Sequence, residues 1–161
     1  MSDSAPISIG IYEYIDYRNP ADAFREYDPV FPEVAHLVAA EITRLMPDAI
    51  VEHVGSSAVP GCAGKGVVDL MVNYPPGRLV EARDAVDQMG FQRQTNRDPF
   101  PEDRPCRVGT VDLDGNTYRL HVHIIAADAQ EATDQLRFRD RLRVDHALMN
   151  EYVSRKREVL T

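Results

Sequence analysis

The sequence predicts an α/β (α+β) fold in which helices flank a small mixed β-sheet. Helix-type and strand-type apolar periods alternate along the chain, and a glycine-rich turn joins two of the apolar strand segments. The dipeptide Asp114-Gly115 separates two further strand-like runs. Elements that alternate in this way bury their apolar sides by packing as layers of helix and sheet. With 161 residues, the chain is long enough for one domain with its own core.

The first part of the chain yields one clear helix. Residues 1–26 show no overall period, although the alternating isoleucines at positions 7, 9 and 11 would suit a short strand. Asp28-Pro29 is typical of a helix start, with Asp28 as the N-cap and the proline in the first turn. Pro47 ends the predicted helix. Its apolar residues at helical spacing are Val30, Val34, Leu37, Val38, Ile42 and Leu45.

The middle of the chain predicts two strands and a second helix. Residues 50–54 and 67–72 are short apolar runs, each suited to a buried strand. Residues 55–66 between them contain four glycines and one proline, so we expect a loop or a short, interrupted helix. Residues 79–89 have the spacing of an amphipathic helix, and Gly90 would end it.

The last part of the chain predicts a hairpin and helices. Residues 95–106 are polar, contain three prolines and are expected to form a surface loop. Residues 107–112 and 117–126 should pair as a β-hairpin around Asp114-Gly115, a strong signal for a tight turn. The apolar pattern over 136–160 predicts one long helix or two consecutive helices.

Composition restricts the classes of function. The hydrophobic fraction of 43% and the charged fraction of 27% are typical of a soluble globular protein. A net charge of −8 argues against a general nucleic-acid binder, because affinity for the phosphate backbone comes from clustered lysines and arginines. No apolar run reaches the ~20 residues of a membrane span. The first residues also lack the features of a signal peptide. We therefore expect a cytoplasmic protein with no membrane and no nucleic acid among its partners.

The two cysteines, Cys62 and Cys106, are predicted to be reduced thiols. Two cysteines cannot form a disulfide framework, and neither belongs to a CxxC pair.

The turn between the first two strands is the first candidate for chemistry. Gly55 allows an unusual backbone angle or a close approach of a ligand. Ser56 and Ser57 offer hydroxyl and N–H groups to an anion, most strongly where a helix begins. A tight turn that merely requires small residues is the alternative. The segment is neither a P-loop, since Gly64-Lys65 is followed by glycine, nor a G-x-G-x-x-G dinucleotide turn.

Asp69 and two histidines are the second candidate. Asp69 lies within an apolar strand, where an ionised carboxylate needs a metal, a cation or backbone donors, and a structural salt bridge is the alternative. His121 and His123 share one face of their strand with Arg119, because side chains alternate with a period of two. Imidazoles on one face can bind a metal or phosphate or transfer protons. If the two strands are neighbours, Asp69 and both histidines should meet beside Ser56.

The strand and turn just described resemble a known family. Residues 52–69 read EHVGSSAVPGCAGKGVVD, which is similar to the signature of the GrpB-like family. That family resembles the nucleotidyltransferase superfamily, so the resemblance implies a nucleotidyltransferase-like fold over residues 27–161, with 1–26 as an N-terminal extension. The family also occurs as a domain beside dephospho-coenzyme A kinase, which suggests nucleotide or coenzyme A chemistry. Further similar segments are Tyr27-Asp28-Pro29, His121-Val122-His123, residues 136–143, Tyr152 and Lys156.

The resemblance also implies how the site would work. In the superfamily, a Gly-Ser turn holds nucleotide phosphates and a D-x-D strand binds magnesium. Asp69 matches the first acid of that pattern, but Met71 stands at the second and cannot bind magnesium, which is a departure from two-metal catalysis. The strand with His121 and His123 corresponds to the strand of the third acid. Cys62, Gly64 and Gly66 also depart from the family's preferred leucine, alanine and proline.

These observations favour a protein that binds a nucleoside triphosphate and transfers a nucleotidyl group to a small-molecule acceptor. The alternatives are a non-catalytic nucleotide- or coenzyme A-binding module, which Met71 favours, and a metal-dependent hydrolase that uses Asp69 and the histidines. Arg139 and Arg143 share a helix face that is expected to border the cleft, or else to pair with Asp140 and Asp145 at the surface. The residues assigned to phosphate or substrate binding are Gly55, Ser56, Ser57, Lys65, Arg119 and Arg139. Asp69, His121 and His123 are assigned to catalysis and to one divalent cation, magnesium or another.

Overall fold

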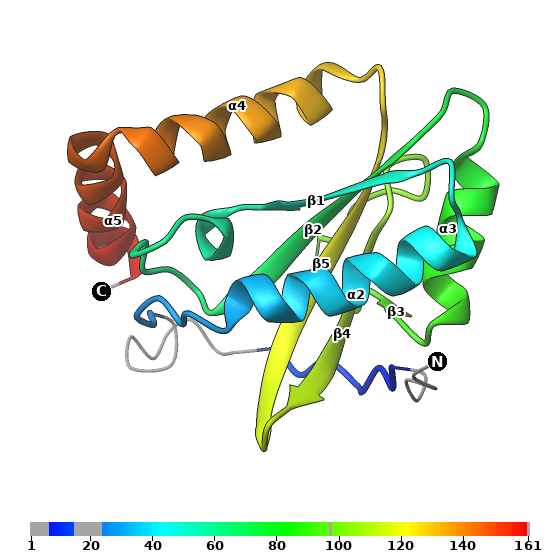
Figure 1. Ribbon diagram of the computed structural model, residues 1–161, viewed down its shortest axis with the longest axis horizontal. Helices are drawn as coiled ribbons and strands as arrows, with labels where there is room; N and C mark the ends of the chain where they lie inside the picture. Colours follow the sequence, from blue (N-terminus) through cyan, green and yellow to red (C-terminus); the bar gives the residue numbers. More distant parts are fainter. Residues whose placement is uncertain (1–6, 15–23, 97, 161) are drawn as a thin grey trace, which may run out of the picture.

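The computed structural model describes residues 7–14, 24–96 and 98–160. Within these residues, five strands form one sheet in the order β1-β2-β5-β4-β3 (Figure 1). The central pair, β2 and β5, is parallel, and all the other neighbours are antiparallel. The strands are β1 (Ile50–Val54), β2 (Val67–Tyr74), β3 (Gln92–Arg93), β4 (Cys106–Leu113) and β5 (Asn116–Ala126).

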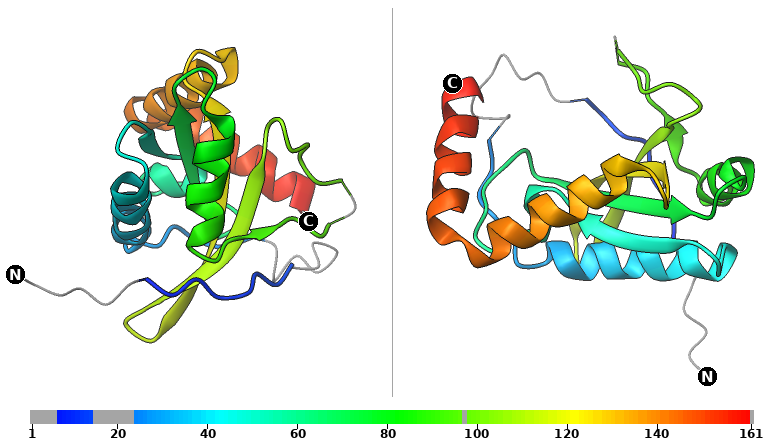
Figure 2. Two further views of the ribbon diagram at one scale, coloured as in Figure 1. Left: turned by 90° about the vertical axis from the view of Figure 1, so that its right-hand side faces the viewer. Right: turned by 90° about the horizontal axis from the view of Figure 1, so that it is seen from above.

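The helices cover one face of the sheet more completely than the other. Helices α2 (Phe31–Leu45) and α3 (Leu79–Gln88) lie side by side on one face (Figures 1 and 2). Helix α4 (Gln130–Val144) runs along the β1 side of the sheet, and α5 (His146–Leu160) turns away at its end. A one-turn 3-10 helix, η1 (Ser56–Ala58), follows β1 directly. The predicted class, a small mixed sheet with flanking helices, is confirmed.

Alternation along the two central strands separates a core face from a second face. Val68, Leu70 and Val72 of β2, together with alternate residues of β5, are fully buried against α2 and α3. The intervening residues point to the opposite face, where α4 covers only one end of the strands. There Met71 and Ile125 pack with Ala132 of α4. Asp69, His121 and His123 lie farther along this second face, so the partial cover by α4 leaves them partly exposed.

The start of the first helix differs from the prediction. Helix α2 begins at Phe31, and Pro32, not Pro29, lies in its first turn. The Asp28 carboxylate does accept a hydrogen bond, from the Val30 N–H at 2.9 Å, but it does so within the turn before the helix. The prediction of Asp28 as the N-cap was therefore wrong by two residues, because the residues after it form a turn first.

The remaining elements follow the sequence pattern closely, with two exceptions. Asp114 (φ 50°) and Gly115 (φ 84°) form the expected tight turn of the hairpin. The C-terminal segment forms two helices, because α4 ends at Val144 and Asp145 is extended. The Asp145 side chain accepts a hydrogen bond from the Leu148 N–H in the first turn of α5. Strand β3 had no signal in the sequence. The isoleucine-rich segment forms one isolated bridge, between Gly10 and Thr110, in place of a strand.

Among the described residues, no helix has both the length and the apolar character required to cross a membrane.

Candidate functional site

The turn after β1 is shaped by its contact with Asp69. Gly55 has φ +73°, which favours glycine, and a Cβ at this position would lie 2.7 Å from Asp69 Oδ2. A Cβ on Gly64 would likewise overlap the Ser56 hydroxyl. Glycine is therefore required at Gly55, where the backbone of the turn packs directly against the carboxylate, whereas a side chain at Gly64 would require the Ser56 hydroxyl to rotate away. This arrangement places the backbone of the turn at Gly55 beside Asp69.

Ser57 is used within the protein. Its side chain is buried, and its Oγ lies 2.8 Å from His53 Nε2 and accepts a hydrogen bond from the Asp69 N–H at 3.4 Å. Burial lowers the pKa of His53 to about 4. The charge of Asp69 raises this pKa, and the charges of Arg143 and Arg139 lower it. His53 is therefore neutral near pH 7 and can accept the Ser57 proton at Nε2. Ser57 thus connects β1 to β2, and its assignment to a phosphate stays a prediction.

Asp69 and the two histidines lie together because β2 and β5 are neighbours. The parallel register pairs Asp69 with His121 and Met71 with His123. Asp69 Oδ1 lies 3.2 Å from His123 Nε2 and 3.8 Å from His121 Nδ1. The three side chains are 24%, 25% and 15% exposed for Asp69, His121 and His123. Burial raises the pKa of Asp69, but the hydrogen bond and charge of His123, together with His121 and Lys156, lower it overall.

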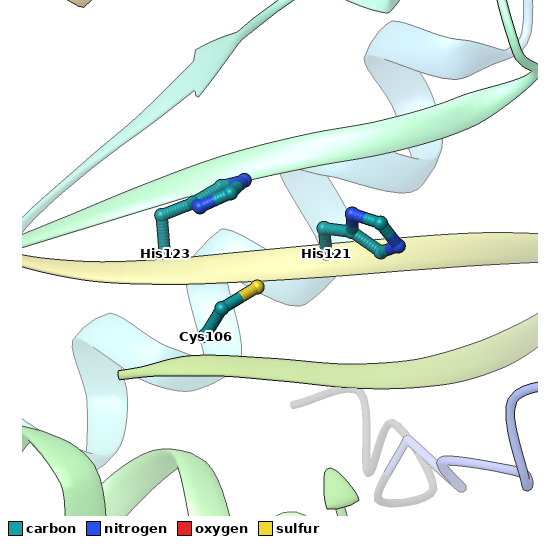
Figure 3. A group of neighbouring side chains, drawn as sticks. All are labelled: Cys106, His121 and His123. Atoms are coloured by element: carbon teal, nitrogen blue, oxygen red, sulfur yellow. The ribbon is translucent and has the colours of Figure 1, made fainter. Parts of the chain in front are cut away.

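A cysteine from the next strand completes the cluster. The hairpin register pairs Cys106 of β4 with His123 of β5, so the thiol lies on the same face as the imidazoles (Figure 3). One donor atom from each of Cys106, His121 and His123 lies within 4.8 Å of the other two. Cys106 is 2% exposed, whereas the histidines face the more open part of the site. Two imidazoles, a thiol and a carboxylate thus meet on one face of three adjacent strands.

Each imidazole has a further partner that influences its protonation. The Tyr12 hydroxyl lies 2.9 Å from His121 Nε2, and burial lowers the pKa of His121 despite the nearby Asp69. Burial lowers the pKa of His123, whereas hydrogen bonds to Asp69 and Cys106 raise it. Arg104 Nη1 lies 3.0 Å from Nδ1, and because a guanidinium can only donate, Nδ1 must carry a lone pair. The hydrogen-bond geometry is therefore that of a neutral His123, with its proton on Nε2 facing Asp69.

Cations gather around Asp69 in a chain whose net charge is −8. The chain contains two lysines, Lys65 before β2 and Lys156 on α5. Burial lowers the pKa of Lys65, and the charge of Lys156 lowers it further, against the effect of Asp69. Arg119 donates from Nη2 to the Lys65 carbonyl at 2.8 Å, while its Nη1 is buried without a hydrogen-bond partner. Lys65 and Lys156 therefore present positive charge to Asp69.

Two of the arginines of α4, Arg139 and Arg143, donate hydrogen bonds to the turn and its flanking strand. Arg139 is 12% exposed and donates to Glu52 Oε2 at 2.9 Å and to the His53 carbonyl at 3.1 Å, and its Nε donates to Asp140. Arg143 donates to the Ala58 carbonyl at 2.9 Å. The alternative was that these arginines pair with Asp140 and Asp145. Arg139 does pair with Asp140, but Asp145 accepts a hydrogen bond from the first turn of α5 instead. The predicted contact of Arg139 with an anion stays a prediction, and its Nε and Nη1 already donate hydrogen bonds within the protein.

Comparison with known proteins identifies the family. The family model described as GrpB protein matches residues 23–161. The chain belongs to the GrpB family. A UPF0157 protein of Vibrio cholerae is 28% identical over 112 residues, which cover 70% of this chain and 56% of that protein. A UPF0157 protein of Pseudomonas aeruginosa is 32% identical over 122 residues, covering 72% of this chain and 48% of that protein. The chain therefore spans about half the length of these two relatives.

Solved structures show the fold of this GrpB-family chain. The crystal structure of the conserved protein GrpB from Enterococcus faecalis aligns with a TM-score of 0.64 and 23% identity, covering 84% of this chain and 81% of that one. Cid1, described as having RNA terminal uridylyl transferase activity, aligns with a TM-score of 0.54 and 15% identity, covering 85% of this chain and 41% of that one. At these identities, the likeness shows the fold alone. The fold is that of the nucleotidyltransferases.

The site of this GrpB-family chain does not fit a pair of magnesium ions. Met71, at the position of the second acid, is 0% exposed and packs with Val54 and Ile125. Asp69 supplies the carboxylate that lies 3.2 Å from the imidazole of His123 and 3.8 Å from that of His121. Magnesium requires near-octahedral oxygen coordination, usually with more than one oxygen ligand from protein and substrate. The donors here are mainly nitrogen and sulfur, so no chemical step is assigned to magnesium.

Sequence reasoning missed Cys106, Arg104, Tyr12 and Lys156 as neighbours of this site. For Cys106, a signal was available. A two-residue turn at Asp114-Gly115 pairs Leu113 with Asn116, and continuing that register pairs Cys106 with His123. Arg104, Tyr12 and Lys156 belong to segments whose positions depend on tertiary packing, so no local pattern predicts their contacts with the site.

Proposed function

We propose that the protein binds a nucleoside triphosphate beside the Gly55-Ser56 turn and transfers the nucleotidyl group to a small-molecule acceptor. The nucleotidyltransferase fold supports this proposal, and so does the packing of the Gly55 backbone against the Asp69 carboxylate. The N–H groups of the turn and the Ser56 hydroxyl would contact the phosphates, as at other helix starts that bind anions.

The observation that carries the proposal is the position of the two lysines. Lys65 and Lys156 are the chain's only lysines, and they come from distant parts of the sequence to act on each other and on Asp69. Two like charges that lie near one another repel, and Asp69 offsets this repulsion with one negative charge. A triphosphate supplies several negative charges in one ligand, so the two lysines would add to its binding.

The side chains present can perform the transfer by positioning and charge neutralisation. An acceptor oxygen would form a bond to the α-phosphorus, the bond to the oxygen that bridges toward the β-phosphate would break, and pyrophosphate would leave. In the metal-free protein, neutral His121 with its Nε2–H directed to Tyr12 has a lone pair on Nδ1, which can accept the acceptor's proton. Asp69 would orient the acceptor, and the lysines would neutralise the phosphates.

A non-catalytic module that binds a nucleotide or coenzyme A is the second candidate. Buried Met71 favours it, because the site lacks the second carboxylate on which the superfamily's chemistry depends. Both candidates require binding of a polyphosphate at the same turn, and they differ only in whether a bond is broken afterwards.

Thermal unfolding with added nucleotides tests the binding. A ligand at one hundred times its Kd stabilises the folded state by about 2.7 kcal/mol, which gives a measurable increase in Tm. Lys156→Gln should weaken nucleotide binding by about tenfold, the effect of losing one charged contact worth ~1.4 kcal/mol. Arg155→Gln is the matched control, since Arg155 is on the same helix, is exposed and pairs with Glu151.

The outcomes separate the candidates. If no nucleoside triphosphate, nucleoside diphosphate or coenzyme A at millimolar concentration raises Tm, binding at this turn is refuted. Equal loss of binding in Lys156→Gln and Arg155→Gln would also contradict the assignment. Binding, together with release of pyrophosphate and movement of a label on the α-phosphorus into the acceptor product, supports transfer. Binding without release in the presence of varied acceptors supports the non-catalytic module.

A further inference from the structure

We propose that Cys106, His121, His123 and Asp69 bind one divalent transition-metal ion of the zinc class. This site adds a fourth donor, the Cys106 thiol, to the residues discussed above and does not require a nucleotide. It lies on three adjacent strands, β2, β5 and β4. Figure 3 shows the side chains that β5 and β4 contribute, His121, His123 and Cys106.

The donor atoms of Asp69 and the two imidazoles are spaced nearly as around a tetrahedral ion. Zinc bonds of ~2.0–2.1 Å to nitrogen and oxygen at the tetrahedral angle separate two ligand atoms by about 3.3 Å. Asp69 Oδ1 lies 3.2 Å from His123 Nε2 and 3.8 Å from His121 Nδ1. Donor atoms of Cys106, His121 and His123 lie within 4.8 Å of one another, so the thiol is near the imidazoles. Binding all four donors to one ion would require side-chain rotations that bring them closer together.

The chemistry of the donors determines the class of metal. Imidazole and thiolate suit zinc and neighbouring transition metals, whereas magnesium and calcium prefer oxygen. Two imidazoles, one thiolate and one carboxylate make a complete set for a four-coordinate ion. Binding would release the proton of the Cys106 thiol, since the thiolate is the ligand.

Contacts outside the cluster favour metal binding by His121 and oppose it at His123. His121 Nε2 lies 2.9 Å from the Tyr12 hydroxyl, so the ring can donate its N–H there while Nδ1 faces the ion. His123 is different, because Arg104 donates to its Nδ1 at 3.0 Å and thereby keeps the ring proton on Nε2. For His123 to bind metal through Nε2, that proton must move to Nδ1, and the Arg104 guanidinium must withdraw. Arg104 therefore competes with the metal, and its removal should strengthen binding.

Cobalt(II) titration of the nucleotide-free full-length protein tests the site. A tetrahedral cobalt ion bound to a thiolate gives intense visible bands and a sulfur-to-metal charge-transfer band, so the ligand set is read without any activity assay. We expect one equivalent to bind with this spectrum and to be displaced by zinc. Cys106→Ser should abolish the charge-transfer band, and His121→Gln should weaken binding by at least about tenfold. Cys62→Ser is the matched control, because Cys62 is also buried but packs with Leu142 and Met149. Thermal unfolding establishes that each variant is folded.

Arg104→Gln provides a test that does not remove a ligand. Tighter cobalt binding than in the wild type supports the proposal, and unchanged or weaker binding contradicts the predicted competition. No stoichiometric binding, an octahedral spectrum, or a charge-transfer band that Cys62→Ser removes and Cys106→Ser does not would overturn the site. Cobalt binding without any nucleotide-induced Tm shift would refute the proposed function and leave the metal site intact. A nucleotide-induced Tm shift without cobalt binding would refute the metal site alone.

Discussion

Protonation of His53 is expected to destabilise the fold as the pH falls. His53 Nε2 lies 2.8 Å from Ser57 Oγ, and Ser57 in turn accepts a hydrogen bond from the backbone of Asp69. Burial lowers the pKa of His53 from 6.5 to about 4 in the folded protein. Between these two values the unfolded chain binds a proton that the folded protein does not, so stability rises with pH across this interval. The destabilisation is absent above about pH 6.5 and grows toward pH 4.

The size of this effect follows from the shift in pKa. A difference of roughly 2.5 pKa units at ~1.4 kcal/mol per unit corresponds to about 3 kcal/mol of unfolding free energy. That is a large share of the 5–15 kcal/mol (roughly) that stabilises a typical domain. His53→Gln removes the titrating ring and keeps an acceptor for Ser57, so it should cost about 1 kcal/mol near pH 7. Its relative stability should then improve as the pH falls, and it should exceed the wild type before pH 4.

Urea unfolding of the wild type and of His53→Gln, measured at a series of pH values, gives the difference in unfolding free energy directly. His36→Gln is the control, because His36 is exposed on α2 and its replacement should leave the pH dependence near that of the wild type. If the wild type and His53→Gln lose stability in parallel between about pH 6.5 and pH 4, the buried neutral imidazole is not the cause.

Two further predictions concern the face of the sheet that carries the site. Gly55→Ala should lower the unfolding free energy by about 2–4 kcal/mol, because it combines an unfavourable positive φ with a Cβ 2.7 Å from Asp69 Oδ2. Gly77→Ala has a similar φ, +84°, but open space around the Cβ, so chemical denaturation should show a loss of only about 1–2 kcal/mol. Met71→Asp, which recreates the D-x-D pattern, should destabilise by several kcal/mol, on the order of 3 or more, because the carboxylate would be buried among apolar side chains. Met71→Leu should cost less than about 1.5 kcal/mol, and equal melting temperatures for the two Met71 variants would contradict this account.

Local pattern was sufficient to predict most of the fold. The apolar periods of the helices and strands, and the Asp114-Gly115 turn, each reflect contacts within a few residues or burial on one side of an element. The start of α2 was placed wrongly because Asp28 can stabilise either a helix or the turn before it, and both use the same local hydrogen bond. Strand β3 was missed because two residues contain too little alternation to be recognised.

The site was predictable as far as periodicity extends. Alternation along β5 places His121 and His123 on one face, and the apolar surroundings of Asp69 require a partner for its charge. Their meeting additionally required that β2 and β5 be neighbours in parallel register, which is a property of the whole sheet. The predicted phosphate residues Ser57 and Arg139 are already hydrogen-bonded within the fold, which no spacing in the sequence indicates.

The sequence by itself determined the family, the alternating pattern of the elements and the residue types available for chemistry. It also indicated that position 55 needs a small residue, because Gly55 belongs to the family signature. Only the tertiary structure decided which side chains join the histidines and Asp69: Cys106 from β4 near both imidazoles, Tyr12 from the N-terminal segment at His121, and Lys156 from α5 near Asp69. The physical reason is that contacts between segments far apart in sequence depend on how the sheet and helices pack, and this packing is driven by the burial of apolar surface elsewhere in the chain.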